Sequence, residues 1–237
     1  MTAAPTWYHT IDLPDGPTPG AVDLRGVAPR VLPRRLDGLR AVDVGTFDGF
    51  WAFELERRGA AEVLATDLER FDEAQWPRPN RPALSAEAGD RSPGERFGLA
   101  HRALGSQVRR VVTPVHELTA ERLGGPVDVA VMGDLLLHLR DPVGALERVH
   151  DALTPGGRLI SLEQVNVPLT VLRPRRAAGS FQARATSMSW WEPNLRCLRD
   201  WLALGGFASS RIRHVYRLRA HGPQARWHVA LEARRAP

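Results

Sequence analysis

The feature that most constrains the fold is an alternation of short apolar runs with helical segments, which starts at Leu39. Five runs have the length and composition of buried strands: residues 39–44, 61–68, 108–118, 127–135 and 157–165. Helical spacing of apolar residues follows the first and fourth runs, over residues 47–60 and 141–157. Strands that alternate with helices predict a parallel sheet covered on both faces.

The two ends of the chain follow different patterns. After a predicted helix over 194–207, residues 209–220 and 225–234 alternate between polar and apolar, and Gly222 and Pro223 lie between them. This pattern predicts an antiparallel hairpin at the end of a seven-stranded, mostly parallel sheet. Residues 1–38 are rich in Pro and Gly, which predicts an irregular N-terminal arm or lid. The domain proper is expected over 39–237.

Two further segments fit neither a strand nor a helix in this scheme. Residues 70–95 and 164–190 follow the second and fifth predicted strands. In an open α/β sheet, segments in these positions lie beyond the carboxyl ends of the strands, where ligands bind. We therefore expect both to form caps over a binding site.

Composition excludes several classes of protein. A chain of 237 residues predicts a single domain, and its one cysteine, Cys197, excludes an internal disulfide and a cysteine-based zinc cluster, so no metal is expected. The net charge of +5 favours an anionic partner, but all 32 basic residues are arginine, a bias that also reflects base composition. The sequence shows neither 18 consecutive apolar residues nor a signal-peptide pattern, so a cytoplasmic location without membrane contact is expected.

The segment "AVDVGTFDGF" (41–50) places a glycine turn directly after the first predicted strand. Gly45 and Gly49 match a dinucleotide-binding turn, but Phe47 stands where the middle glycine would be, and Asp48 follows it. A bulky ring and an acid make a poor cradle for two phosphates. The sequence therefore predicts a different ligand at this turn.

Two acids end neighbouring predicted strands. Asp43 closes the first strand and Asp67 the second. A carboxylate in the second position can accept two hydrogen bonds from a ribose diol, as it does in dinucleotide-binding folds. The spacing thus predicts a nucleoside ligand without the diphosphate.

Together these motifs resemble the class I S-adenosylmethionine (SAM) dependent methyltransferases, whose turn reads D-x-G-x-G-x-G. "MGDLLLHLRDP" (132–142) and "LTPGGRLI" (153–160) agree with that family, and the resemblance spans about residues 39–237. It implies a Rossmann-like α/β fold and SAM as cofactor. Asp43 or Asp48 would pair with the amino group of SAM, amides of the turn would bind its carboxylate, and the ring of Phe47 would pack beside it. The cofactor residues implied are Asp43, Gly45, Thr46, Phe47, Asp48, Gly49, Asp67, Leu68, His116, Glu117 and Gly133.

A narrower resemblance points to bacterial enzymes related to the tRNA wobble-uridine transferases that use carboxy-SAM. It is carried by "WYHTIDLPDG", "DVGTFDGFWAFELERRGA", "GDLLLHLRDP" and "SWWEPN". Those enzymes hold the extra carboxylate with a lysine, a tyrosine and an arginine. Here there is no lysine, and Leu137 occupies the position of the tyrosine. Ordinary SAM and methyl transfer are therefore the better interpretation.

Catalytic and acceptor-binding candidates follow from the same alignment of motifs. Asp134 closes the fourth strand beside the expected methyl group, and His138 follows by about one helical turn, so either can act on the acceptor; a histidine bonded to the backbone is the alternative for His138. Tyr8 and His9 form a lid over the cofactor or staple the arm to the core. Because this arm could close over Asp134 and His138, His9 is also a candidate for the catalytic base, ranked slightly below His138. Trp190 and Trp191 line an acceptor pocket or belong to the core.

The expected function is methyl transfer to an oxygen or nitrogen of a small molecule, in specialised (natural-product) metabolism. A base is needed only if the acceptor must lose a proton. Two alternatives remain: a tRNA-modifying enzyme, and a SAM-binding protein without catalysis. Arg173, Arg175 and Arg176 would bind an anionic substrate or RNA, or form a solvated run.

Overall fold

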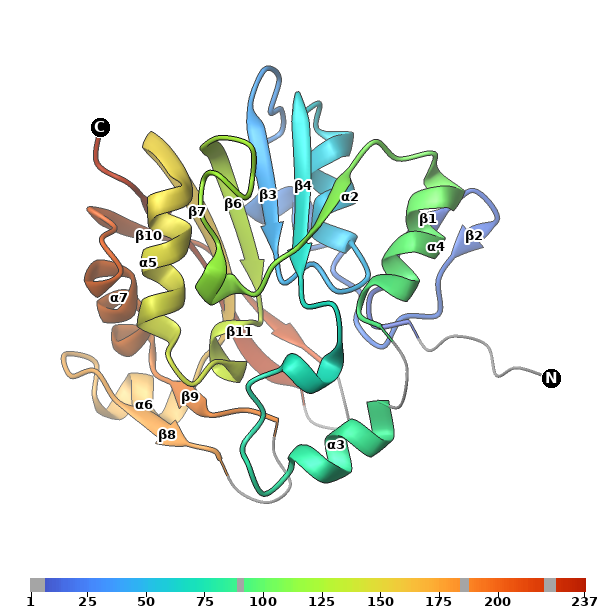
Figure 1. The fold of residues 1–237 in the computed structure, drawn as a ribbon. Coiled ribbons are helices and arrows are strands. Elements are labelled where there is room, and N and C mark those ends of the chain that lie inside the picture. The colour runs from blue at the N-terminus through green and yellow to red at the C-terminus, as the bar shows by residue number, and fades with distance from the viewer. Residues whose placement is uncertain (1–6, 89–91, 184–187, 220–224) are drawn as a thin grey trace.

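The central feature is a seven-stranded sheet in the order β10-β11-β7-β6-β3-β4-β5 (Figure 1). The computed structural model describes residues 7–88, 92–183, 188–219 and 225–237. Five neighbouring strands pair in parallel, and β11 runs antiparallel between β7 and β10. The strands are β3 (Arg40–Val44), β4 (Glu62–Asp67), β5 (Arg109–Val112), β6 (Val127–Gly133), β7 (Leu153–Gln164), β10 (Ser209–Leu218) and β11 (Arg226–Arg234). The predicted sheet and its C-terminal hairpin are confirmed, although Gly222 and Pro223 lie outside the described residues.

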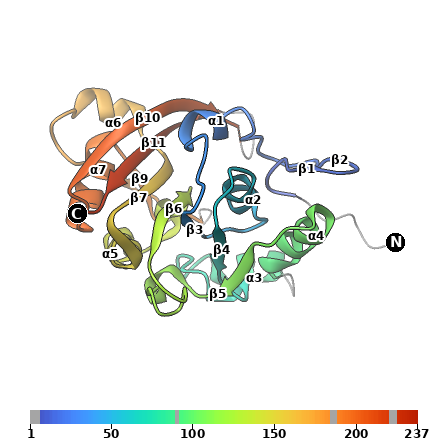
Figure 2. The ribbon, with the colours of Figure 1, turned by 90° about the horizontal axis from the view of Figure 1, so that it is seen from above.

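Helices cover both faces of this sheet, because its central strands are apolar on both sides. One face carries α1 (Ala28–Val31), α2 (Phe50–Arg57) and α4 (Gly94–Leu104); the other carries α5 (Pro142–Ala152) and α7 (Leu195–Leu204) (Figure 2). Asp141 begins α5, since its side chain accepts a hydrogen bond from the Gly144 amide at 2.8 Å. In the described parts of the chain, no helix is long and apolar enough to cross a membrane.

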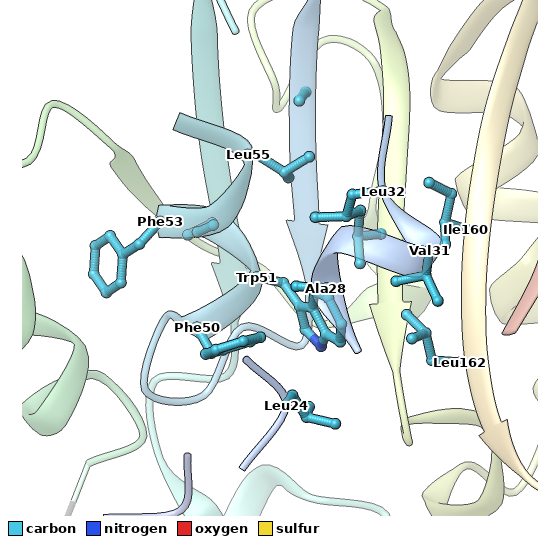
Figure 3. Close-up of a cluster of buried hydrophobic side chains, with 14 of the residues drawn as sticks. Leu24, Ala28, Val31, Leu32, Phe50, Trp51, Phe53, Leu55, Ile160 and Leu162 are labelled. Carbon is cyan, nitrogen blue, oxygen red and sulfur yellow. The ribbon is translucent and has the colours of Figure 1, made fainter. Parts of the chain in front are cut away.

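The N-terminal segment contributes directly to the core. Residues 7–38 contain a small hairpin of β1 (Asp12–Leu13) and β2 (Gly16–Pro17) before α1. Leu24 and Val31 are buried together with Trp51 and Leu162, so the segment closes the face that α2 leaves open (Figure 3). Residues 1–6 lie outside the described part. The segment packs on the domain over most of its length, more tightly than an irregular arm implies.

Both cap segments contain regular structure that the sequence pattern did not predict. Residues 70–95 include η1 (Phe71–Glu73), α3 (Arg81–Ala88) and the start of α4; β5 is followed by η2 (Val115–Glu117) and β6 by η3 (Leu136–His138). Residues 164–190 include α6 (Val167–Leu172) and β8 (Gly179–Phe181), which pairs with β9 (Trp191–Pro193). These elements are short and bury few of their own side chains, so hydrophobic periodicity does not reveal them. Residues 89–91 and 184–187 of the caps are not described.

The helix expected over 47–60 begins later, at Phe50. Phe47 has a φ of 52° and lies in the turn before the helix, so it does not share a helical face with Trp51 and Leu55. Gly49 is the N-cap, with a φ of 95°. The turn is left-handed at both residues, a geometry that apolar spacing does not encode.

Candidate cofactor and methyl-transfer site

The glycine turn between β3 and α2 is closed by its own hydrogen bonds. The amides of Gly45 and Thr46 both donate to the carbonyl of Thr66, at 2.9 and 3.0 Å, and the Gly49 amide donates to the Thr46 carbonyl. Gly49 is required twice over, because its φ is positive and an added Cβ would lie 2.4 Å from the ring of Phe53. The two predicted turn glycines thus fix a tight approach of strand and helix.

Asp43, at the end of β3, holds one carboxylate oxygen without a partner. Its Oδ2 accepts hydrogen bonds from the Thr46 hydroxyl at 2.7 Å and the Ala52 amide at 3.0 Å, whereas the buried Oδ1 has none. Burial raises the pKa of Asp43 to about 7, and the Thr46 hydrogen bond only partly opposes this. An ammonium group beside Oδ1 would supply the missing partner and favour the charged carboxylate.

Asp67, at the end of β4, connects the turn to the neighbouring strand. Its Oδ2 accepts a hydrogen bond from the Phe47 amide and its Oδ1 one from the Leu68 amide, both at 2.7 Å. Burial raises the pKa of Asp67 despite these bonds. Each oxygen keeps a second lone pair, so the carboxylate can also accept hydroxyl groups of a ribose.

Asp48 binds the N-terminal segment instead of projecting freely from the turn. This carboxylate is fully buried and accepts hydrogen bonds from the amides of Tyr8 and His9, at 3.2 and 2.7 Å, while its Oδ1 lies 2.5 Å from His9 Nδ1. The ring of Tyr8 meets that of Phe47 edge-on at 5.4 Å. Residues 7–9, hereafter the strap, therefore lie across the glycine turn. Of the two acids Asp43 and Asp48, Asp43 is the one with an unpartnered carboxylate oxygen.

Asp134 ends β6 in a left-handed conformation, with a φ of 47°. Its amide donates to the Leu162 carbonyl at 2.7 Å, and its Oδ1 accepts the Gln164 amide at 3.1 Å. At the preceding residue, Gly133, an added Cβ would lie 2.7 Å from the indole nitrogen of Trp51. A strained residue that neighbouring strands hold in place is typical of a functional position.

His228 of β11 forms a buried ion pair with Asp134, a contact that the sequence reasoning missed. His228 Nε2 lies 3.2 Å from Asp134 Oδ2, and Nδ1 lies 3.1 Å from the Arg226 carbonyl. Both ring nitrogens thus face acceptors, which favours the doubly protonated, cationic ring. Burial lowers the pKa of His228, but Asp134 and the Arg226 carbonyl outweigh this, and the pKa is raised. The signal in the sequence that could have identified His228 was a histidine on the inward face of a predicted alternating strand.

A small cavity of about 20 Å³ lies beside Asp134 at the carboxyl end of β6. Its walls come from the strap, from α2 and from four segments far apart in sequence: Tyr8, His9, Val22, Leu24, Trp51, Gly133, Asp134, Leu162 and Tyr216. Glu163, next to Leu162 in β7, is buried with an unpartnered Oε2, and burial raises its pKa well above the usual range. The cavity brings together the predicted Tyr8, His9, Gly133 and Asp134.

Three other predicted residues lie in contacts between the caps. His138 Nδ1 is 3.2 Å from the Met188 carbonyl, and burial lowers the pKa of this histidine. The indole nitrogens of Trp190 and Trp191 donate to the carbonyls of Gln75 and Leu139, at 2.5 and 3.1 Å. None of these three residues is among the described residues that line the small cavity. They connect the two caps to the turn after β6.

His116 and Glu117 lie at a separate, larger hollow or on the surface. His116 Nε2 is 2.8 Å from the Asp141 carbonyl and Nδ1 is 3.2 Å from Gln75 Nε2, beside a cavity of about 290 Å³. Glu117 is exposed and pairs with Arg122 at 3.0 Å. Both ring nitrogens of His116 thus have partners within the protein. Among the described residues, no group of His, Cys, Asp and Glu has the arrangement of a metal site.

This strand order, with an acid ending each of two neighbouring strands around a glycine turn, defines a class I SAM-dependent methyltransferase. A family profile described as a methyltransferase domain matches residues 22–209, and the chain belongs to that family. No curated protein sequence matches significantly. The expected enzyme class, fold and SAM cofactor are confirmed.

Solved structures share the fold at low identity. A SAM-dependent methyltransferase from Mesorhizobium loti is 19% identical, with a TM-score of 0.56 over 92% of this chain and 99% of its own. The 1,6-didemethyltoxoflavin-N1-methyltransferase of Burkholderia thailandensis, solved with its substrate and S-adenosylhomocysteine, is 18% identical, with a TM-score of 0.58 over 90% and 78%. The N-terminal domain of EvdMO1 with S-adenosylhomocysteine bound is 15% identical, with a TM-score of 0.56 over 89% and 79%.

Proposed function

We propose that the protein transfers a methyl group from SAM to an oxygen or nitrogen of a small molecule, in specialised metabolism. The observation that carries this proposal is the small cavity beside Asp134, which the strap covers and which is lined by side chains from across the chain. An enclosed cavity suits a small acceptor better than a nucleic acid. The toxoflavin-precursor methyltransferase, which has the same fold, acts on such an acceptor.

The cofactor turn suits SAM in the chemistry of its donors. Asp43 Oδ1, buried and unpartnered, fits the amino group, and Asp67 fits the ribose hydroxyls, with Gly45, Phe47 and Leu68 around them. Bound there, SAM supplies an electrophilic methyl group on a sulfonium. No diphosphate is needed, which agrees with the acids that surround the turn.

Asp134 is the group that faces the acceptor in this proposal. Paired with His228, the Asp134 carboxylate would accept a hydrogen bond, and then the proton, from the hydroxyl or amine of an acceptor. Tyr8 and Tyr216 complete the wall and orient the acceptor. Most of the rate acceleration then comes from holding the acceptor in line with the methyl group.

Entry of an acceptor requires the strap or a cap to move. A cavity of about 20 Å³ holds roughly one water molecule. The hydrogen bonds from the strap to Asp48 and from Trp190 to Gln75 and Leu137 are the ones that such a movement would break. Because the strap touches both Phe47 and the cavity, cofactor binding and acceptor enclosure are coupled through it.

A tRNA-modifying enzyme is the second candidate. It is favoured by the sequence resemblance and by the exposed arginines Arg173, Arg175 and Arg176 next to α6. It is opposed by the absence of lysine and by Leu137 in place of the clamp tyrosine. The alternative therefore lacks the groups that would hold a carboxylated cofactor.

One experiment separates these candidates. The protein is incubated with methyl-labelled SAM and a panel of small phenols, alcohols and amines, and tRNA binding is measured in parallel at about 0.15 M salt. We expect methylation of at least one small acceptor class, and tRNA binding no tighter than roughly 10⁻⁴–10⁻⁶ M. A tight, tRNA-selective complex with no small-molecule methylation would favour the second candidate.

A further inference from the structure

Arg96 is a buried cation beside the glycine turn, and no described acid pairs with it. It lies in the first turn of α4, is only 6% exposed, and its guanidinium carbon is 6.0 Å from the centroid of the Phe47 ring. Its Nε is buried and has no hydrogen-bond partner. Within the described ranges, no carboxylate forms an ion pair with Arg96, in contrast to Arg58 and Arg110, which pair with Glu54 and Glu69.

An unpaired guanidinium in such a position is costly. Burial of a charge is tolerated in proteins when an opposite charge and hydrogen bonds compensate it. The Phe47 ring supplies a cation–π contact, which is weaker than a charged hydrogen bond and provides no acceptor for the buried Nε–H. Since no described carboxylate meets this guanidinium, the position is suited to an anion that a ligand supplies.

The turn itself has little to offer a carboxylate. The amides of Gly45, Thr46, Phe47 and Gly49 all donate to groups within the protein. Asp43, Asp48 and Asp67 surround these amides with acidic side chains. The expectation that turn amides bind the SAM carboxylate thus has no free donor at these four positions, and a cation near the turn would favour a carboxylate there.

We propose that Arg96 binds the carboxylate of the methionyl part of the cofactor. In this arrangement the Asp43 carboxylate faces the ammonium group of the methionyl part, and the Arg96 guanidinium faces its carboxylate. Phe47, between the ribose-binding Asp67 and the strap, supports the guanidinium from one side. The proposal rests on the proposed cofactor site and is independent of the methyl acceptor.

Calorimetry with two probes tests this assignment. S-adenosylhomocysteine carries the carboxylate, and S-adenosyl-3-thiopropylamine, its decarboxylated form, keeps the amino group and the nucleoside. We expect Arg96→Met to weaken S-adenosylhomocysteine binding about 10- to 150-fold, which corresponds to the loss of one charged hydrogen bond, and to leave the decarboxylated probe within about twofold. Arg96→Lys keeps the charge and should recover part of the affinity. Arg102→Met, exposed on the same helix, is the matched control.

Each other outcome has a defined meaning. Equal weakening of both probes would assign Arg96 a structural role and overturn the proposal, as would unchanged binding of S-adenosylhomocysteine. Thermal melting checks that Arg96→Met folds; if it does not, the comparison of Arg96→Lys with wild type on the two probes decides in the same way. If the wild-type protein binds neither probe, the proposed cofactor site itself is wrong. This failure is distinguishable from failure of the Arg96 proposal because the wild-type protein alone reveals it.

Discussion

The glycine turn and the small cavity beside Asp134 are neighbours but are built in different ways. The turn is built mainly from the ends of two neighbouring strands and the start of α2: Asp43 bonds to Thr46 and Ala52, and Asp67 bonds to Leu68 and to the Phe47 amide. The cavity is assembled from the strap, the end of β6 and the final hairpin, so that Tyr8, Asp134 and Tyr216 meet. In the proposed site, cofactor binding therefore rests mainly on two strand ends and the turn between them, whereas acceptor binding rests on segments from across the fold.

This difference teaches where specificity can change. A local turn that binds an invariant ligand requires a few fixed residues, and the surrounding chain can vary without affecting it. A cavity walled by distant segments changes shape when any one of them is altered. We therefore expect substitutions at the turn to affect SAM binding, and substitutions at the cavity to affect turnover.

The largest expected effect is at Asp134. Because Asn tolerates the left-handed backbone, Asp134→Asn should fold, yet it removes the proton acceptor. Turnover of an acceptor that must lose a proton should fall about 10²- to 10⁴-fold, with SAM affinity within about threefold. His138→Ala, whose ring bonds to the Met188 carbonyl, should cost less than about tenfold. Initial rates with labelled SAM decide; equal losses in the two variants would make His138 the base.

The next largest effect is expected at Asp67, and it concerns only the affinity for SAM. Loss of the carboxylate removes the ribose acceptor and the bond from the Phe47 amide, so Asp67→Ala should weaken SAM by about 1.5–3 kcal/mol for each charged hydrogen bond lost. Asp72→Ala, an exposed acid that pairs with Arg70, is the control. Calorimetry that finds unchanged affinity in a folded Asp67→Ala protein would remove this residue from the site.

The ion pair of His228 with Asp134 should contribute to stability in a pH-dependent way. Its removal by His228→Gln should lower the free energy of unfolding by about 1.5–3 kcal/mol below pH 6. The folded pKa of His228 is raised, so this contribution is fully present below the unfolded pKa and is lost as pH rises through the folded one. Urea melts from pH 5 to 9 measure it. His214→Gln, in the neighbouring strand, should show no such trend; parallel curves for the two variants would contradict the assignment.

The smallest effect is the pH dependence of cofactor affinity. The pKa of Asp43 is raised to about 7, and only its carboxylate form suits the ammonium group, so S-adenosylhomocysteine binding should strengthen about tenfold between pH 6 and 8, with proton release below pH 7. In the free protein the same shift acts in the other direction: the folded state binds the proton more tightly, so stability falls as pH rises from about 4 to 7. Calorimetry in buffers of different ionisation enthalpy counts the protons, and an affinity that does not vary with pH would assign the ammonium to another group.

The sequence by itself determined the sheet, its hairpin and the positions of Gly45, Gly49 and Asp67. The sheet and hairpin follow from period-two and period-3.6 patterns, the two glycines from a turn motif, and Asp67 from its place at the end of the next predicted strand. It also selected Asp43 and Asp134 as strand-end acids. It did not distinguish Asp43 from Asp48, because the deciding contact, the strap on Asp48, joins residues about forty positions apart.

Only the tertiary structure decided the partners of these acids. His228 reaches Asp134 because β11 inserts next to β7 and sets His228 opposite Gln164, whose amide Asp134 also binds. Arg96 is set against Phe47 by the packing of α4, and Trp190 against Gln75 by the meeting of two caps. Such contacts join segments whose local patterns do not depend on one another. A single sequence carries the propensities of each segment, whereas burial and charge pairing arise only when the segments are packed together.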